Sequence, residues 1–332
     1  MPQSSISDFC QAFLAKAIYS TTKAPIAVHS RLGLRSVALI SQPHLPGLDL
    51  INSALLPSTD IPTEHIYLWS SESVTSLEEI PGYQLIQRLH PSESEFDDFR
   101  VACDPSGLFI YVFNAKSREG AVWISPLLGN QPEPLITPFR ALLSWIIQAD
   151  HGQILHGAAF DFHGYGVLLS GPSGSGKSVI THRALVAGSE ILADDAILLI
   201  GGMAYPVYTK MKLKEELPPE LLQTLNSAPE MVGTKSTLNL FTLGERFLPQ
   251  MAANYLLFPT VTQNSTLTTV ATMTAVKKIL IDSSSETLGS GAGTLKALMS
   301  TLSKSQCYEW QLVTDVEENW TQLLTIFPKS DK

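Results

Sequence analysis

The sequence has few cysteines and lacks an apolar run of membrane-spanning length, and each shortage narrows the class of protein. Its 332 residues include three cysteines, which are far apart and form no C-x-x-C pair: Cys10, Cys103 and Cys307. Three reduced thiols are therefore favoured over a disulfide framework or a zinc site. Charges at Arg140 and at Asp194 and Asp195 interrupt the apolar stretches around them, so we expect no membrane-spanning helix.

Positive charge is also scarce. The chain has 22 lysines and arginines against 31 aspartates and glutamates, a formal net charge of -9. Nucleic acids and anionic membranes attract basic surfaces, so this balance argues against both as partners. The start of the chain is polar where a secretory signal peptide carries a basic head and an apolar centre. We therefore expect a soluble, cytoplasmic protein.

The composition is that of a globular chain long enough for two domains, with 44% hydrophobic and 16% charged residues. Residues 7–19 place apolar side chains on one helical face, and residues 99–128 contain three β-rich runs separated by turn-like sequences. Residues 138–149 then predict a helix with proline in its first turn. We predict a small α+β domain at 1–150 and a second domain at 151–332.

One stretch matches the phosphate-binding P-loop (Walker A) pattern G-x-x-x-x-G-K-[ST] at every fixed position. Its residues are Gly171, Pro172, Ser173, Gly174, Ser175, Gly176, Lys177 and Ser178. Glycines let successive backbone N–H groups turn toward phosphates, and the following helix contributes the positive end of its dipole. The pattern predicts that Lys177 reaches the β- and γ-phosphates of ATP and that the Ser178 hydroxyl holds Mg²⁺.

The flanking sequence supplies the strand and the helix that this motif requires. Residues 165–170 are an apolar run of strand length, and residues 179–187 form a helix-compatible run closed by Gly188. Residues 190–195 indicate a second strand, adjacent to the strand that leads into the P-loop, which predicts a crossover and a partly parallel sheet. Further β-like runs are at 196–200, 254–261, 276–281 and 308–314, and helical runs begin near 214, 293 and 317.

Paired acids follow that second strand. Asp195 lies 17 residues after Ser178, where P-loop enzymes place the group that holds Mg²⁺ through water or polarises the attacking nucleophile. A turn or helix cap that uses one aspartate is the structural alternative. We interpret Asp194 and Asp195 as functional.

These landmarks together resemble the kinase domain of HPr kinase/phosphorylase, a bacterial serine kinase. The matching residues are His156-Gly157, Gly164 to Ser170, the P-loop, Gly188 and Ala193 to Asp195, which fit without a gap over about forty residues. The resemblance implies an α/β fold with a P-loop nucleotide domain of the phosphoenolpyruvate carboxykinase/HPr kinase-like type. It implies that Lys177 and Ser178 bind triphosphate and Mg²⁺, that Asp195 takes the proton from the substrate serine, and that His156 lies in the phosphate pocket.

The chain departs from that family in two places. The family's downstream glycine-rich signature, which supplies a metal-binding Glu, has no recognisable counterpart here. The family also has a basic residue in a later loop that contacts the substrate. Arg246 and Lys235 are candidates for it by their region of the chain alone, and surface charges are the favoured alternative. These departures bring HPr as substrate and the reverse phosphorylase reaction into question. The chain looks more like HPr-kinase-related proteins such as the kinases of lasso-peptide precursors. The resemblance also suggests a homo-oligomer.

Two further stretches are candidates for the site. Residues 207–213 alternate apolar and basic side chains as an edge strand beside a pocket would, and Lys210 is the favoured phosphate-binding lysine, with a solvated strand face as the alternative. Glu215 or Glu216 could replace the missing metal ligand, although acids are common at the start of helices.

The sequence thus predicts transfer of the ATP γ-phosphoryl group to a hydroxyl, that of a Ser on a protein or peptide. Lys177 and the loop amides stabilise phosphate charge, Asp194 and Ser178 hold Mg²⁺, Asp195 accepts the proton, and His156 contacts the transferred group or orients Asp195. A non-catalytic ATP-binding regulatory or scaffold module and a small-molecule kinase stay open as alternatives.

Overall fold

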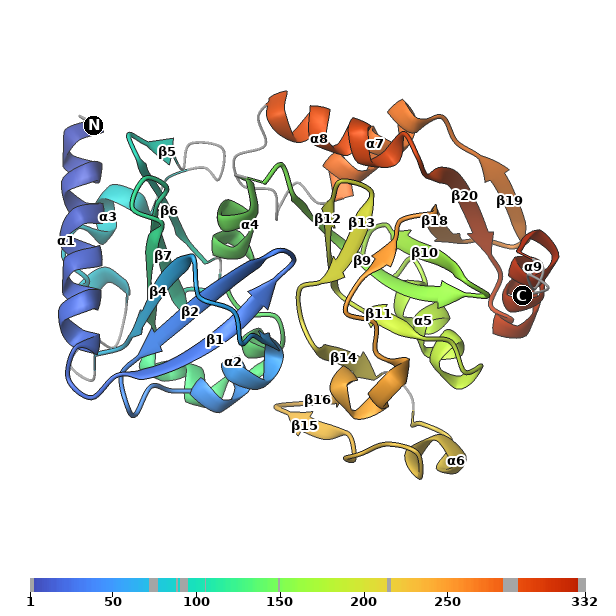
Figure 1. Ribbon diagram of the computed structural model, residues 1–332, viewed down its shortest axis with the longest axis horizontal. Helices are drawn as coiled ribbons and strands as arrows, with labels where there is room; N and C mark the ends of the chain where they lie inside the picture. Colours follow the sequence, from blue (N-terminus) through green and yellow to red (C-terminus); the bar gives the residue numbers. More distant parts are fainter. Residues whose placement is uncertain are drawn as a thin grey trace. The chain divides into compact units, whose positions relative to one another are not determined.

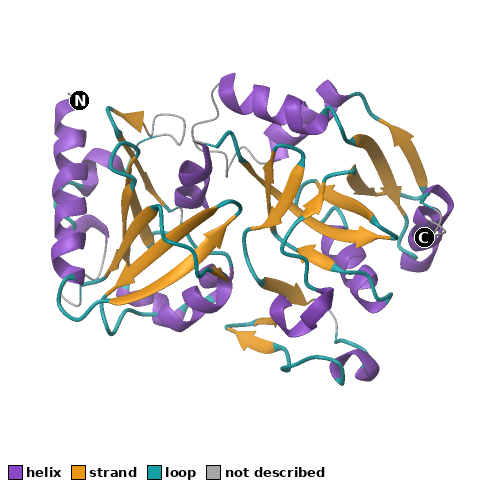
Figure 2. Ribbon diagram, in the orientation of Figure 1, coloured by secondary structure: helices purple, strands orange, loops and turns teal. Residues whose placement is uncertain are grey.

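The computed structural model describes residues 3–71, 77–87, 89, 95–104, 106–148, 150–213, 216–282 and 292–327. The chain divides into two compact units (Figure 1). One is built on Met1–Ala149, and the other on Asp150–Thr287 with Gly291–Lys332. Each unit mixes helices and strands around a large sheet, as Figure 2 shows, so the predicted mixed α/β architecture is confirmed.

The first unit is built on an eight-stranded sheet in the order β3-β1-β2-β4-β8-β7-β6-β5. Its strands are β1 (Ile26–Leu32), β2 (Arg35–Ser41), β3 (Leu56–Pro57), β4 (Glu64–Trp69), β5 (Glu95–Phe96), β6 (Phe99–Cys103), β7 (Phe109–Asn114) and β8 (Glu119–Ile124). Its helices are α1 (Gln3–Thr21), α2 (Leu48–Ala54), α3 (Tyr83–Ile86) and α4 (Arg140–Gln148), with 3₁₀ turns η1 (Leu77–Glu79), η3 (Pro126–Asn130) and η4 (Glu133–Ile136).

Sequence periodicity explains the layers of this unit. The apolar face of α1 packs on the sheet through Phe9, Phe13 and Ala17, at the i, i+4, i+8 spacing of a helix. Strands β6, β7 and β8 form an antiparallel meander. The predicted opening helix, the meander and the helix before the second unit are therefore present, although α4 begins at Arg140 and leaves Pro138 outside it.

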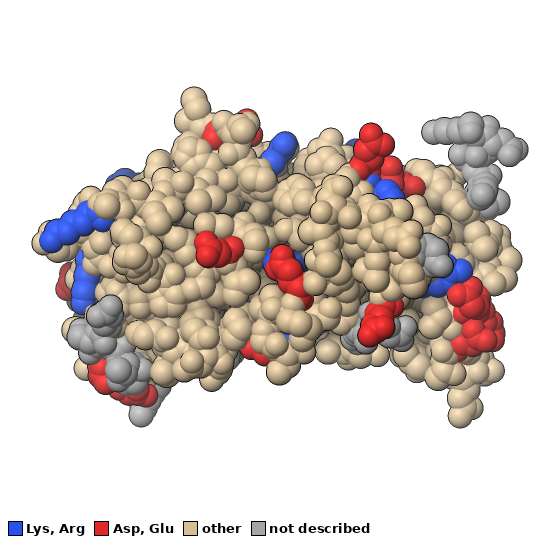
Figure 3. All heavy atoms as spheres, turned by 90° about the horizontal axis from the view of Figure 1, so that it is seen from below, with Lys and Arg blue, Asp and Glu red and all other residues tan. Residues whose placement is uncertain are grey.

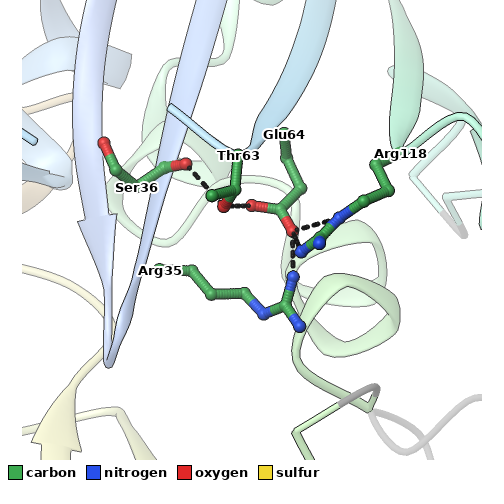
Figure 4. Close-up of polar contacts among 5 residues, drawn as sticks. All are labelled: Arg35, Ser36, Thr63, Glu64 and Arg118. Carbon is green, nitrogen blue, oxygen red and sulfur yellow. Dashed lines mark hydrogen bonds and ion pairs between the residues drawn. The ribbon is translucent and has the colours of Figure 1, made fainter. Parts of the chain in front are cut away.

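A buried carboxylate forms ion pairs with arginines near the starts of two other strands in the first unit (Figure 4). Glu64, the first residue of β4, is 1% exposed and pairs with Arg35 of β2 and with Arg118, whose Nε lies 3.1 Å from Glu64 Oε1. The Thr63 hydroxyl donates to the second carboxylate oxygen. Both oxygens of this buried acid therefore have partners, as burial of a charge requires.

The second unit is built on a nine-stranded sheet, ordered β17-β13-β12-β9-β10-β18-β20-β19 with β11 paired to β9. The strands are β9 (Gln153–Phe162), β10 (Tyr165–Ser170), β11 (Ile191–Ala193), β12 (Ala196–Ile200), β13 (Met203–Pro206), β17 (Met251–Ala252), β18 (Tyr255–Val261), β19 (Thr266–Thr269) and β20 (Gln306–Leu312). The pairs β10/β18 and β18/β20 are parallel, so the predicted partly parallel sheet is confirmed.

Helices cover both faces of the central strands, which accounts for their continuous apolar sequences. On one face, α5 (Lys177–Val186) and α9 (Val316–Ile326) pack against alternate residues such as Val167 and Leu169 of β10. On the other face, α7 (Thr272–Asp282) and α8 (Ala292–Leu302) pack against Leu168. Figure 1 shows α5 and α7 on opposite sides of this sheet.

Two predictions about the second unit are wrong. The strand before the paired acids, β11, is not a neighbour of β10, because the ten-residue strand β9 lies between them and pairs with both. The run at 276–281 is helical and lies in α7, where Ala275, Val276 and Ile279 are buried at helical spacing. The alternation of apolar and charged residues there follows a helix face and not a strand.

A smaller sheet, ordered β14-β16-β15, completes the second unit. It contains β14 (Lys210–Leu213), β15 (Glu230–Val232) and β16 (Lys235–Asn239), with the short helix α6 (Pro219–Leu222) and the 3₁₀ segment η5 (Leu240–Arg246) beside it in sequence. Strand β14 is an edge strand, as predicted.

On the face drawn in Figure 3, Lys and Arg side chains lie in small separate groups. A membrane-crossing helix, which would have to be long and apolar, is not found in the described part of the chain.

Candidate active site

The P-loop connects β10 to α5 as the motif predicts. Gly174 has φ +84° and Gly176 has φ +102°, backbone conformations that L side chains rarely adopt. A Cβ at position 176 would also lie 2.6 Å from Leu312 Cδ1. The glycines are therefore required both for the curl of the loop and for its close packing on β20.

Lys177 begins α5 and is turned back into the loop. Its Nζ donates to the carbonyl oxygen of Gly171 at 2.6 Å and to that of Pro172 at 2.9 Å. The residue is 7% exposed. The Lys177 side chain therefore bridges two carbonyl groups of the P-loop and lies beside the loop N–H groups that would bind a phosphate.

A cavity of about 450 Å³ opens in front of this loop. The P-loop residues that line it are Ser173, Gly174, Gly176, Lys177 and Ser178. His156, Asp194 and Asp195 line the same cavity. The structure therefore brings together eight of the residues that the sequence singles out; Gly171 and Ser175 belong to the loop without being part of the lining.

The fold brings His156 to the acids through β9. The two acids lie between β11 and β12, and both of these strands pair with β9. The Gly157 N–H donates to the Asp195 carbonyl at 3.1 Å. His156 Nδ1 consequently lies 3.8 Å from Asp195 Oδ1, at the distance of an ion pair if the imidazole is protonated.

The environment of Asp194 is unusual for a buried acid. It is 5% exposed, and its Oδ2 accepts from the Lys212 backbone N–H at 3.3 Å. Its Oδ1 has no hydrogen-bond partner among the described residues. Burial, followed by the charge of Asp195, raises the pKa of Asp194 to about 7, against smaller lowering effects from Lys212 and from the nearby Ser178 hydroxyl.

The Ser178 hydroxyl oxygen and Asp194 Oδ1 fit a magnesium ion. Mg²⁺ prefers hard oxygen ligands and is usually held by one or two protein groups together with water and substrate phosphates. The Ser178 hydroxyl and the unpartnered Oδ1 of Asp194 supply such a pair beside the P-loop. The orphaned buried oxygen is the observation that supports a cation here, because burying such an atom without a partner is costly.

Among the described residues, Lys210 does not line the phosphate-binding cavity, contrary to what the sequence pattern predicts for it. Its side chain is 1% exposed, and its Nζ lies 2.8 Å from Glu230 Oε2. Lys210 is not among the described residues that line the cavity. Lys212, two residues further along β14, lines the cavity instead and places its Nζ 3.3 Å from Asp195 Oδ2. The pairing of Lys210 with an acid from β15 is the physical reason for the difference.

The remaining candidates differ in position. Lys235 lines the cavity together with Leu213, which ends the candidate stretch 207–213, and Thr234, which the sequence pattern does not single out. An Arg246 guanidinium nitrogen donates to the carbonyls of Leu185 and Ser189, a structural role. Glu216 is exposed and lies outside the described lining, and Glu215 is outside the described residues.

Comparison with curated proteins finds similar proteins that are named HPr kinase/phosphorylase. HPr kinase/phosphorylase of Stenotrophomonas maltophilia strain K279a is 30% identical over 131 residues, which cover 39% of this chain and 33% of that protein. HPr kinase/phosphorylase of Xanthomonas euvesicatoria is 28% identical over 131 residues, with the same coverage. The chain is therefore similar to HPr kinase/phosphorylase, and the matched part spans about a third of the length of these relatives.

Other comparisons add less. The HPr(Ser) kinase/phosphatase structure from Coxiella burnetii matches with 12% identity and a TM-score of 0.28, covering 52% of this chain and 94% of that one. That score is below the level that establishes a shared fold. No protein-family model matches the chain.

Proposed function

We propose that the second unit is an ATP- and Mg²⁺-dependent kinase that transfers the γ-phosphoryl group to a hydroxyl, that of a Ser on a protein or peptide. The observation that carries this proposal is that Lys177 and Asp195 line one cavity, on which the P-loop and the acid pair converge. Similarity to proteins named HPr kinase/phosphorylase supports the same reaction type. ATP as substrate would place the protein in the cytoplasm.

Phosphate binding is assigned to the P-loop side of the cavity. The backbone amides of the loop and the first turn of α5 present partial positive charge. Lys177 Nζ would exchange its carbonyl partners, Gly171 and Pro172, for phosphate oxygens. Ser178 and Asp194 Oδ1 would hold the metal ion, which when bound neutralises charge on the phosphate oxygens.

Proton transfer is assigned to Asp195. As the acceptor hydroxyl oxygen bonds to the γ-phosphorus, its proton passes to the Asp195 carboxylate and the bond from the γ-phosphorus to the bridging oxygen of ADP breaks. His156, with Nδ1 3.8 Å from Asp195 Oδ1, orients that carboxylate. The enzyme contributes positioning and charge stabilisation and needs no covalent intermediate.

Substitution of the proposed base tests this assignment. Asp195→Asn should reduce phosphoryl transfer roughly a thousandfold, the scale of general base catalysis, while ATP binding is retained. Glu216→Gln is a matched control, since Glu216 is an exposed acid of the same unit. Both quantities are measured on the purified full chain, with labelled ATP, Mg²⁺ and cell extract for transfer. Full transfer by Asp195→Asn contradicts the assignment.

The same assay separates the proposal from its alternatives. Label on a protein or peptide supports a serine kinase of the proposed kind. Label on a metabolite shows a small-molecule kinase, and ATP binding without transfer shows a regulatory module. Either of the last two results overturns the proposed acceptor.

A further inference from the structure

Lys212 lines this cavity and contacts both acids. Its Nζ lies 3.3 Å from Asp195 Oδ2, and its backbone N–H donates to Asp194 Oδ2 at 3.3 Å. It comes from β14 of the small sheet and not from the P-loop (Figure 1). The cavity thus has a cation on the side of the acid pair as well as on the side of the phosphate-binding loop.

Three of the lysines near this cavity differ in how tightly their ammonium groups are held. Lys177 donates to two loop carbonyls, and Lys210 is buried against Glu230 at 2.8 Å. The Lys212 side chain is 33% exposed and its contact with Asp195 is longer. Partly exposed ion pairs contribute little net free energy, so the Lys212 ammonium can leave Asp195 at small cost when a more highly charged partner enters.

A terminal phosphate beside Asp195 creates a charge problem. The carboxylate that must approach the γ-phosphoryl group carries the same sign of charge, and like charges at contact distance repel. The metal ligands proposed above lie at Ser178 and Asp194, so they do not screen Asp195 directly. The partly exposed Lys212 ammonium, which already lies 3.3 Å from Asp195 Oδ2, is placed to do so.

We propose that Lys212 makes the site selective for a nucleoside triphosphate over a diphosphate, because its ammonium moves from Asp195 to the terminal phosphate. The inference rests on the proposed function and adds a specificity-determining residue to it. A diphosphate leaves Lys212 paired with Asp195. A triphosphate draws the ammonium away, which frees Asp195 Oδ2 to accept the hydroxyl proton only when a transferable group is present.

Equilibrium binding of two nucleotides tests this without relying on activity. The non-hydrolysable triphosphate AMP-PNP and the diphosphate ADP, each with Mg²⁺, are titrated into the full-length wild type, Lys212→Met, Lys212→Gln and Lys304→Met. Lys304→Met is the charge-matched control, since Lys304 is exposed and outside the described lining. Loss of a charged hydrogen bond should weaken AMP-PNP binding about tenfold or more in both Lys212 variants and change ADP binding less than about twofold.

Each outcome is decisive. Equal weakening of AMP-PNP and ADP binding, or no weakening, overturns the inference while the proposed function stands. Failure of the wild type to bind either nucleotide overturns the proposed function itself. If Lys212→Met does not fold, Lys212→Gln carries the comparison, and Lys212→Arg should restore preference for AMP-PNP because it keeps the positive charge. A Lys212→Arg protein that prefers neither nucleotide contradicts the proposal.

Discussion

Among the described residues, each unit buries one carboxylate at an end of a sheet strand, and the surroundings of the two carboxylates are opposite in kind. Glu64 in the first unit is surrounded by two arginines and a threonine hydroxyl, so that both of its oxygens have partners. Asp194 in the second unit is buried beside another acid, with Oδ1 lacking a partner among the described residues. Burial alone therefore does not mark a functional acid.

The difference lies in what each acid lacks. Glu64 is neutralised within the chain, as a structural ion pair must be to offset the cost of desolvation. Asp194 is left with an unused oxygen and a raised pKa, a pattern typical of groups that act on something outside the chain. We interpret Glu64 as an acid that stabilises the fold and Asp194 as an acid that acts in the candidate active site.

The largest expected effect separates the two acids by reaction rate. Asp194→Asn should lower phosphoryl transfer at least roughly a hundredfold, because the charge stabilisation supplied through a bound metal ion is worth several kcal/mol. Glu64→Gln should leave kcat unchanged at a temperature where it is folded. Initial rates over a range of Mg²⁺ concentrations measure both. A loss of rate in Glu64→Gln as large as that in Asp194→Asn would erase the distinction.

The next effect is on the free energy of unfolding. Here we expect the larger loss in Glu64→Gln and not in Asp194→Asn. Glu64→Gln should lower the free energy of unfolding by about 3 kcal/mol, because it leaves two guanidinium groups without their buried partner. Asp194→Asn should cost nothing at pH 8 or stabilise the protein, since it removes a poorly compensated buried charge. Urea denaturation followed by tryptophan fluorescence measures the change. Greater destabilisation by Asp194→Asn would show that Asp194 is the structural acid.

The smallest effect is a pH dependence of stability that comes from Asp194. Because the pKa of Asp194 rises from 3.8 to about 7 on folding, the folded state binds more protons than the unfolded state between those values. Stability from this group is complete below about pH 4 and is lost as pH rises through about 7. Denaturation of wild type and Asp194→Asn between pH 4 and 8, without Mg²⁺, isolates this change. Parallel pH curves for the two proteins would contradict the assigned environment.

Local signals in the sequence predict much of this site. The strand at Tyr165–Ser170 and the helix closed by Gly188 follow directly from an apolar run, a glycine-rich turn and a helical run. Asp194 and Asp195 were selected by their distance along the chain from Ser178. The strand and the helix are confirmed, because the motif and its flanks are contiguous and short-range rules suffice to place them. The two acids line the cavity, and their roles stay predictions.

Predictions that depend on long-range pairing fail. Lys210 and Lys212 stand two residues apart on β14, so alternation places both on one face. Which of them reaches the cavity depends on Glu230, an acid from another strand of the small sheet. In the same way, the insertion of β9 between β10 and β11 depends on strand order, which no local pattern encodes.

Following the γ- and α-phosphates of ATP separately tests the central claim most directly. ATP labelled at the γ-phosphorus and ATP labelled at the α-phosphorus are each incubated with wild-type protein, Mg²⁺ and cell extract. We predict that only the γ-label appears, as a stable ester on a serine, and that Asp195→Asn lowers the rate of its appearance roughly a thousandfold. Transfer of the α-label, or bound ATP with no label transferred from either position, would contradict the account.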